Sequence, residues 1–271
     1  MSLDYNNLAK QVLDVANKVR TDPKSYVNIL SENLKYFRGK IFAKPGQDAI
    51  QTNEGRSAFE EAIDFLKVQQ PVDALTPSEH LSNACRDHVK DIGPKGLASH
   101  DGSDGSNVSD RIERYGEWDG ALAENIEFGG RTAEEIVISW IVDDGLKYEG
   151  RMHRKNLFGA DFKYAGVYTG DHKEYGTVTV MDFTAGVRNK GEESPDVQNF
   201  IRDYLDKTLY NNEKKQSKNA FQEEDPDAPD DTVSVRYQKV IKNIRGKDRK
   251  VTKKIYTLTD GSQHIVEIEE A

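Results

Sequence analysis

The chain has 271 residues, a charged fraction of 31% and a formal net charge of −9 at pH 7. This length allows one large domain with appendages or two small domains, and the negative charge gives no general basis for binding nucleic acid. The single cysteine, Cys85, cannot form an intramolecular disulfide, and no segment approaches the roughly 20 consecutive apolar residues that span a membrane.

The N-terminal segment from Met1 to Arg20 has neither a long apolar run nor a cleavage site with small residues, so we expect no signal peptide. Disulfides are typical of secreted proteins, and this chain has one cysteine. Together these features predict a cytoplasmic protein.

The first part of the chain has the apolar spacing of helices. A first helix is predicted over residues 5–20, and a short second helix begins after Pro23. The following stretch, from about residue 35 to 56, contains several glycines and a proline, so we expect an irregular insertion there.

Capping boxes predict the starts of the next helices. Ser57 with Glu60 predicts one start, and Thr76 with Glu79 predicts the next, whose apolar stripe ends at Gly93-Pro94. A third box precedes a helix near residue 133, and apolar runs over 165–169 and 177–183 predict strands. Helices first and strands late indicate a mixed α and β fold.

Four short motifs follow one another between Leu97 and Phe158. They are SHDG with His100, AENI with Glu124, SWIVDDG with Trp140, and HRKN with His153. Histidines and carboxylates on loops and helix ends are typical of a polar cleft or a metal site. In this order the motifs resemble those of the CAP superfamily, also called SCP/TAPS or PR-1-like, over roughly residues 8–186.

The resemblance implies an α+β fold, a three-layer α-β-α sandwich with a small antiparallel sheet. This CAP domain would occupy residues 1–188 and carry the insertion at about 35–56. The chain departs from the family pattern at Ala123, where glycine is usual, and at Arg151 and Met152, where related sequences have a tighter Gly-His pair.

The resemblance also implies a cleft with two histidines and two carboxylates. His100, Glu124 and His153 match family positions. The second carboxylate falls on Asp143, with Asp144 beside it. His100 and His153 are the expected ligands of a divalent cation, Zn²⁺ or Mg²⁺. Supporting structural roles are expected for Asn125, Trp140 and Asn156.

Beyond the resemblance, the sequence predicts an extra helix at 194–211, an acidic linker at 212–231 and a β-hairpin tail at 232–271. The tail is basic, with nine Lys or Arg and one acid between Arg236 and Lys254. A lone hairpin is marginally stable in water. We therefore expect the tail to dock on the first domain or on an acidic surface of a partner.

The cleft residues suit three roles, which are binding a cation or ligand, bracing loops, and hydrolysis. No serine or cysteine lies in an established nucleophile motif. We expect a non-catalytic interaction module in an intracellular assembly, for example a cytoskeletal one, attached to a protein partner through the basic tail, with no nucleic acid. The alternatives are a metal-dependent hydrolase of peptides or esters, and a protein that binds lipid or a membrane surface.

Overall fold

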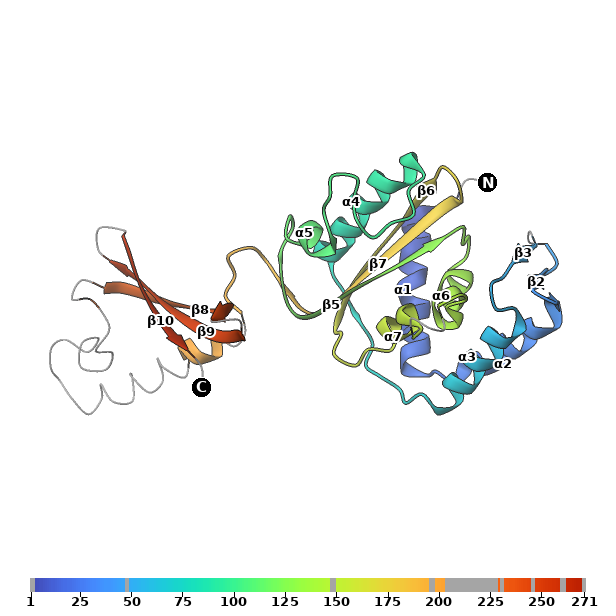
Figure 1. Ribbon diagram of the computed structural model, residues 1–271, viewed down its shortest axis with the longest axis horizontal. Coiled ribbons are helices and arrows are strands. Elements are labelled where there is room, and N and C mark those ends of the chain that lie inside the picture. Colours follow the sequence, from blue (N-terminus) through green and yellow to red (C-terminus); the bar gives the residue numbers. More distant parts are fainter. Residues whose placement is uncertain are drawn as a thin grey trace. The chain divides into compact units, whose positions relative to one another are not determined.

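The computed structural model divides into two compact units, Met1–Glu192 and Glu193–Ala271, which are described separately (Figure 1). The division lies close to residue 188, where the first domain is predicted to end. The structure describes residues 3–46, 49–146, 150–194, 198–202, 229, 232–244, 247–258 and 262–269. Within these ranges no helix is long and apolar enough to cross a membrane.

A four-stranded sheet forms the centre of the first unit. Its strands, in spatial order, are β4 (Thr76–Pro77), β6 (Tyr164–His172), β7 (Gly176–Arg188) and β5 (Glu117–Phe128). The three long strands pair antiparallel, and the short β4 pairs parallel with β6. β6 and β7 form a hairpin that turns at Gly176, whose φ of 81° is open to glycine without strain.

Helices cover both faces of this sheet (Figure 1). They are α1 (Tyr5–Thr21), α4 (Glu79–Lys95), α5 (Val108–Ile112), α6 (Ala133–Val142) and α7 (Met152–Leu157). The helices α2 (Ser25–Asn33) and α3 (Arg56–Val68) pack on each other, and α3 packs on α6. Along β7, Val178 and Val180 pack against α4, whereas Met181 and Phe183 join the core formed with α1, α3 and α6. This alternation follows from the two-residue period of a strand. The result is the three-layer α-β-α sandwich that the resemblance implies.

Helix α4 has different ends from those predicted. Its N-cap is Ser78, whereas Thr76 lies in β4. The helix continues through Gly93-Pro94, where the glycine allows close packing on β6. A Cβ at Gly93 would lie 2.2 Å from the carbonyl oxygen of Asp171. The helix ends at Gly96, which takes the left-handed conformation with a φ of 68°.

The described residues of the insertion, 35–46 and 49–56, contain regular elements, whereas the sequence predicts an irregular segment. The elements are a 3₁₀ helix η1 (Leu34–Tyr36) and three short antiparallel strands, β1 (Phe37–Arg38), β2 (Ile41–Phe42) and β3 (Ile50–Gln51). The rings of Phe37 and Phe42 lie 5.0 and 5.7 Å from that of Phe59 in α3, centroid to centroid. Aromatic packing of this kind fixes the insertion on α3.

The predicted capping box of α3 is not formed. Gly55 is the N-cap, and no side chain caps the helix. The Ser57 hydroxyl donates to the carbonyl oxygen of Glu54 (2.9 Å), and Glu60 pairs with Arg56 on the surface (2.7 Å). The capping-box prediction is therefore wrong for α3. The helix begins two residues earlier than the box predicts, after Gly55, so Ser57 is not the N-cap.

The second unit contains a three-stranded antiparallel sheet in the order β10-β9-β8. Its strands are β8 (Thr232–Ile244), β9 (Lys247–Leu258) and β10 (Gln263–Glu269). β9 and β10 form the predicted hairpin, with Ile255 opposite Ile265, and β8 adds a third strand. Residues 198–202 of the predicted helix at 194–211 are helical. Residues 203–211 and the predicted linker at 212–231, apart from Pro229, lie outside the described residues.

Arg20 of α1 ties together three backbone segments, and its loss is expected to destabilise the first unit. Its buried guanidinium donates to the carbonyls of Asp73 (2.9 Å), Leu157 (2.6 Å), Gly159 (3.1 Å) and Phe162 (3.3 Å). We predict that Arg20→Met lowers the free energy of unfolding by about 3 kcal/mol, because four backbone carbonyls, those of Leu157 and Phe162 among them at buried residues, lose their donor. Urea denaturation measures the change.

The matched control is Lys10→Met, an exposed position on the same helix. Its free energy of unfolding should stay within about 0.5 kcal/mol of the parent value. Equal stability of the two variants would contradict the role assigned to Arg20.

Candidate functional site

A cavity of about 300 Å³ lies in the first unit. Its walls come from the loop that follows α4, the start of α5, strand β5 and helix α7. They are formed by His100, Asp101, Asn107, Val108, Glu124, Met152, His153 and Asn156. The structure thus brings three of the predicted cleft residues, His100, Glu124 and His153, to one cavity.

One wall is held by a buried glutamate that lies between a histidine and an arginine. Glu124 Oε1 lies 2.7 Å from Nδ1 of His100, and Glu124 Oε2 lies 2.7 Å from Nη2 of Arg111. Arg111 is itself buried and also donates to the carbonyl oxygens of Ser106 (2.8 Å) and His100 (3.2 Å). Both oxygens of Glu124 are therefore engaged, Oε1 by the His100 ring and Oε2 by Arg111.

The electrostatics of this pair agree with its geometry. The hydrogen bond to Glu124 raises the pKa of His100, although partial burial opposes this. Burial alone would raise the pKa of Glu124, but the hydrogen bond from His100 and the charge of Arg111 outweigh it and lower that pKa. Glu124 is thus an anion in a buried position, where only an acceptor role is open to it.

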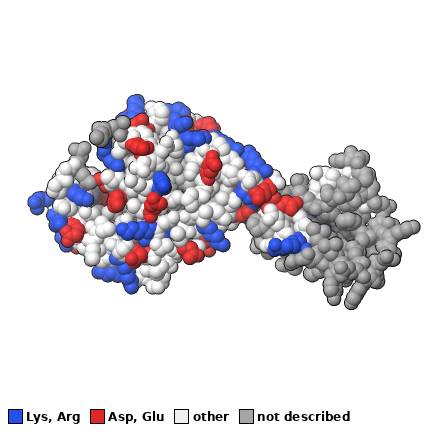
Figure 2. Space-filling view, turned by 180° about the vertical axis from the view of Figure 1, so that it is seen from behind, with Lys and Arg blue, Asp and Glu red and all other residues white. Residues whose placement is uncertain are grey.

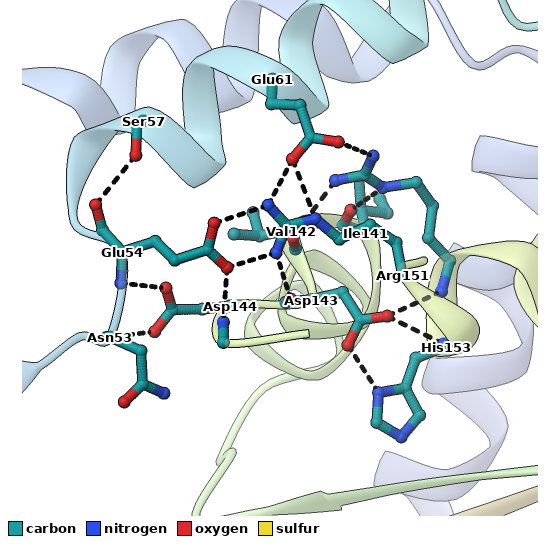
Figure 3. Close-up of polar contacts among 12 residues, drawn as sticks. Asn53, Glu54, Ser57, Glu61, Ile141, Val142, Asp143, Asp144, Arg151 and His153 are labelled. Atoms are coloured by element: carbon teal, nitrogen blue, oxygen red, sulfur yellow. Dashed lines mark hydrogen bonds and ion pairs between the residues drawn. The ribbon is translucent and has the colours of Figure 1, made fainter. Parts of the chain in front are cut away.

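The other wall is held by an aspartate between two helices (Figure 3). Asp143 ends α6 in the left-handed conformation, with a φ of 55°. Its Oδ1 lies 2.7 Å from Nδ1 of His153, and its Oδ2 accepts from the backbone N–H of His153 (2.8 Å). An anion is unfavourable at a helix C-terminus but favourable at an N-terminus. Asp143 satisfies the first turn of α7, which offsets its place at the end of α6.

Asp144 does not share this role. Its carboxylate accepts from the backbone N–H groups of Asn53 (2.6 Å) and Glu54 (2.8 Å) in the insertion. It is not among the residues that line the cavity. Of the two adjacent acids that the sequence offered for the cleft, the structure places Asp143 against the histidine and Asp144 against the insertion.

The three predicted supporting residues hold the surrounding backbone. Asn125 donates to the carbonyl oxygen of His153 (2.9 Å), and Asn156 donates to Oδ1 of Asn125 (2.9 Å). Trp140 is buried in the core that the sheet forms with α1, α3 and α6. The two asparagines therefore tie β5 to α7 across the cavity wall.

Asp182 of β7 lies beside the cavity residue Glu124 and is not predicted from the sequence. It is fully buried and lies opposite Glu124 in the strand register. Neither of its oxygens has a hydrogen-bond partner among the described residues. Burial, and then the negative charge of Glu124, raise its pKa well above the usual range. A signal was present in the sequence, because Val178, Val180 and Asp182 alternate on one face of a buried strand.

The two imidazoles are the side chains of this cavity that could hold a divalent cation. In His100 and His153, Nδ1 is bonded to a carboxylate, which leaves Nε2 as the ligand atom. The two carboxylates are occupied in holding the rings. Among the residues that the structure describes, no three His, Cys, Asp or Glu side chains form a cluster able to hold a metal. Any such site would therefore have two protein ligands and open positions.

Comparison with known sequences adds an independent finding. The model of the CAP family, described as the cysteine-rich secretory protein family, matches residues 13–183. The chain is 26% identical over 131 residues to the uncharacterized protein YkwD of Bacillus subtilis (strain 168), covering 47% of this chain and 47% of YkwD. The chain thus spans about half the length of this curated relative. The family match includes every residue of the cavity wall.

Comparison with solved structures gives distant likenesses. An outer surface protein from Borrelia burgdorferi is 17% identical, with 47% of this chain and 88% of that chain covered and a TM-score of 0.36. An extracellular protein containing a SCP domain from Bacillus anthracis str. Ames is 19% identical, with 48% and 39% covered and a TM-score of 0.34. NaASP2 with Zn²⁺ is 12% identical, with 67% and 83% covered and a TM-score of 0.35.

Asp182 should make stability depend on pH. An acid whose pKa is raised by folding binds its proton more tightly in the folded state, so stability falls as pH rises above the unfolded pKa of about 4. Asparagine resembles the protonated acid and cannot ionise. We predict that Asp182→Asn is more stable than the parent at pH 7.5 and that the difference shrinks toward pH 4. The difference should change by up to about 1.4 kcal/mol per pH unit.

Thermal unfolding across this pH range provides the measurement, with Asp161→Asn at an exposed position as the control. The control should show no such trend. A stability difference for Asp182→Asn that is the same at pH 4 and pH 7.5 would contradict a raised pKa at Asp182.

Proposed function

Since the chain belongs to the CAP family, the cysteine-rich secretory protein family, we propose that its first unit is a non-catalytic binding module whose cleft holds a divalent cation, with zinc preferred. The observation that carries this proposal is the presence of two imidazoles on one cavity, each bonded through Nδ1 to a buried carboxylate. This arrangement is the usual support for histidine ligands of a metal.

The imidazole–carboxylate pairs prepare the ligand atoms. A carboxylate accepts hydrogen bonds, so the neutral ring donates from Nδ1 and keeps the lone pair of Nε2 free. Imidazole is a preferred ligand of zinc, whereas Mg²⁺ prefers oxygen ligands. When bound, the cation would supply Lewis acidity and open positions for water or for a group on a partner.

The lining of the cavity favours binding over covalent catalysis. None of the residues that line it is a serine, threonine or cysteine. Cys85 is fully buried, its thiol donates to the carbonyl of Gly166 (3.4 Å), and burial raises its pKa well above the usual range. A thiol in this state is a poor nucleophile. The hydrolase alternative would have to use a cation-bound water.

The second unit supports a proposal about partners. The segment from Arg236 to Lys254, which forms most of β8 and β9, carries the nine basic residues noted above. In the view of Figure 2, the acidic and basic side chains of the first unit are interspersed. We propose that the second unit binds an acidic protein surface in an intracellular, for example cytoskeletal, assembly. An anionic lipid surface is the alternative occupant. The single cysteine supports the cytoplasmic location.

Zinc titration tests the cleft. We expect the protein to bind one zinc ion with micromolar or tighter affinity in calorimetry. His100→Ala and His153→Ala should each weaken binding by about tenfold or more, because each removes a ligand. His80→Ala is the matched control, since His80 is a partly exposed histidine that contacts Asn189 and does not line the cavity.

Three results would contradict the proposal. They are an absence of binding to the parent protein, equal affinities in the parent and both cleft variants, and hydrolysis of ester or peptide substrates by the zinc-loaded protein that His153→Ala abolishes. The last result would leave the cation site standing and would replace the binding role with a catalytic one.

A further inference from the structure

The backbone near the cleft histidine His153 contains residues in the left-handed conformation. Among the described residues, two that are not glycine have a positive φ, Asp143 (55°) and Arg151 (57°). A residue held in the left-handed region costs about 1 kcal/mol or more unless its surroundings fix it. One of these two residues holds the His153 ring, and the other lies two positions before it. The surroundings of Arg151 therefore bear on the cleft.

Arg151 is held by two glutamates. Its Nη1 and Nη2 donate to Oε1 and Oε2 of Glu54 (2.5 and 2.8 Å), which is a bidentate pair. Its Nε donates to Oε2 of Glu61 (2.8 Å), and its Nη1 also donates to the carbonyl oxygen of Asp143 (2.7 Å). The Arg151 side chain is 6% exposed, and Glu54 is the more buried of its two glutamates, 19% exposed against 43% for Glu61. Arg151 thus links the insertion and α3 to the residue that ends α6 (Figure 3).

The link is reciprocal. Glu54 Oε1 accepts from the backbone N–H of Gly145 (2.7 Å), while the Asp144 carboxylate accepts from the backbone N–H groups of Asn53 and Glu54. Each segment therefore supplies a carboxylate to the backbone of the other. Residues 53–54 and 144–145 therefore hold one another in place. Arg151 joins them, because it donates both to the Glu54 carboxylate and to the carbonyl oxygen of Asp143.

The turn at 143–145 also holds a residue of the cleft. Asp143 adjoins Asp144, and its carboxylate holds both the backbone N–H and Nδ1 of His153. A shift of the backbone at 143–145 or at 151 would therefore move the carboxylate or the ring that it orients. The insertion does not line the cavity, yet its contacts end on the residues that place His153.

We propose that Glu54 is a positioning residue for the cleft. Through Arg151 and the exchange of hydrogen bonds with Asp144 and Gly145, the insertion sets the orientation of the His153 ring, and with it the strength with which the cleft binds a cation. The part of this proposal that concerns the cation rests on the proposed function. The part that concerns the ring does not.

The decisive variant is Glu54→Gln, which keeps the shape of the side chain and removes its charge. In the metal-free parent protein, ¹⁵N NMR should show His153 as the tautomer protonated at Nδ1, because Asp143 accepts from that atom. We expect the variant to show a mixture of tautomers at His153 and an unchanged His100, which serves as an internal reference. Zinc affinity measured by calorimetry should fall about tenfold.

The matched control is Glu60→Gln. Glu60 lies on α3 near Glu54, but its pair with Arg56 is on the surface, with about half of each side chain exposed. It should change neither the His153 tautomer nor the zinc affinity. Asp144→Asn is a second test, because it weakens the hold on residues 53–54 while leaving Arg151 and both of its glutamates in place. Asp144→Asn should also produce a mixture of tautomers at His153. It replaces Glu54→Gln as the test if that variant fails to fold.

The proposal is overturned if the variants lose stability but keep both the His153 tautomer and the zinc affinity, since the network would then be purely structural. It is also overturned if Glu60→Gln has the same effect as Glu54→Gln. If the parent protein binds no zinc, the proposed function fails, and the tautomer comparison alone then decides whether the insertion positions His153.

Discussion

Both halves of the cleft depend on one kind of interaction, a buried carboxylate bonded to Nδ1 of an imidazole. Glu124 holds His100 and Asp143 holds His153, each at 2.7 Å. Each buried carboxylate has a further donor that offsets the cost of its burial. Glu124 accepts from Arg111, and Asp143 accepts from the backbone N–H of His153 at the start of α7. In both rings the carboxylate occupies Nδ1, so Nε2 is the nitrogen left for a ligand.

The rest of the first unit places these two pairs. Antiparallel pairing of β5 with β7 puts Glu124 beside Asp182, beneath helix α4. The end of α6 and the start of α7 are joined through Asp143, so His153 follows the packing of both helices. The insertion then closes on the 143–145 turn through Glu54 and Asp144. The cleft is therefore supported on one side by the sheet and on the other by a network that reaches α3.

Much of this was predictable from the sequence. Apolar periodicity and capping patterns located α1, α3, α4 and α6, and the ordered motifs identified the family, the sandwich and the residues His100, Glu124 and His153. The choice between Asp143 and Asp144 was not predictable, because it depends on a left-handed backbone at residue 143 that directs adjacent side chains to opposite surroundings. The sequence predicts an irregular insertion, because glycines and a proline interrupt any strand pattern there. The short strands form in the folded chain, where Phe37 and Phe42 pack on Phe59. Asp182 was overlooked because its partner strand brings it to Glu124 only in the folded chain.

The cleft is proposed to bind one cation through the imidazoles of both His100 and His153. X-ray absorption at the zinc edge, on protein loaded with one equivalent of zinc, tests this most directly. We predict a first shell with two imidazole nitrogens at about 2.0–2.1 Å and the remaining positions filled by oxygen. A shell that contains sulfur, or one with oxygen alone and no imidazole, would contradict the assignment of His100 and His153.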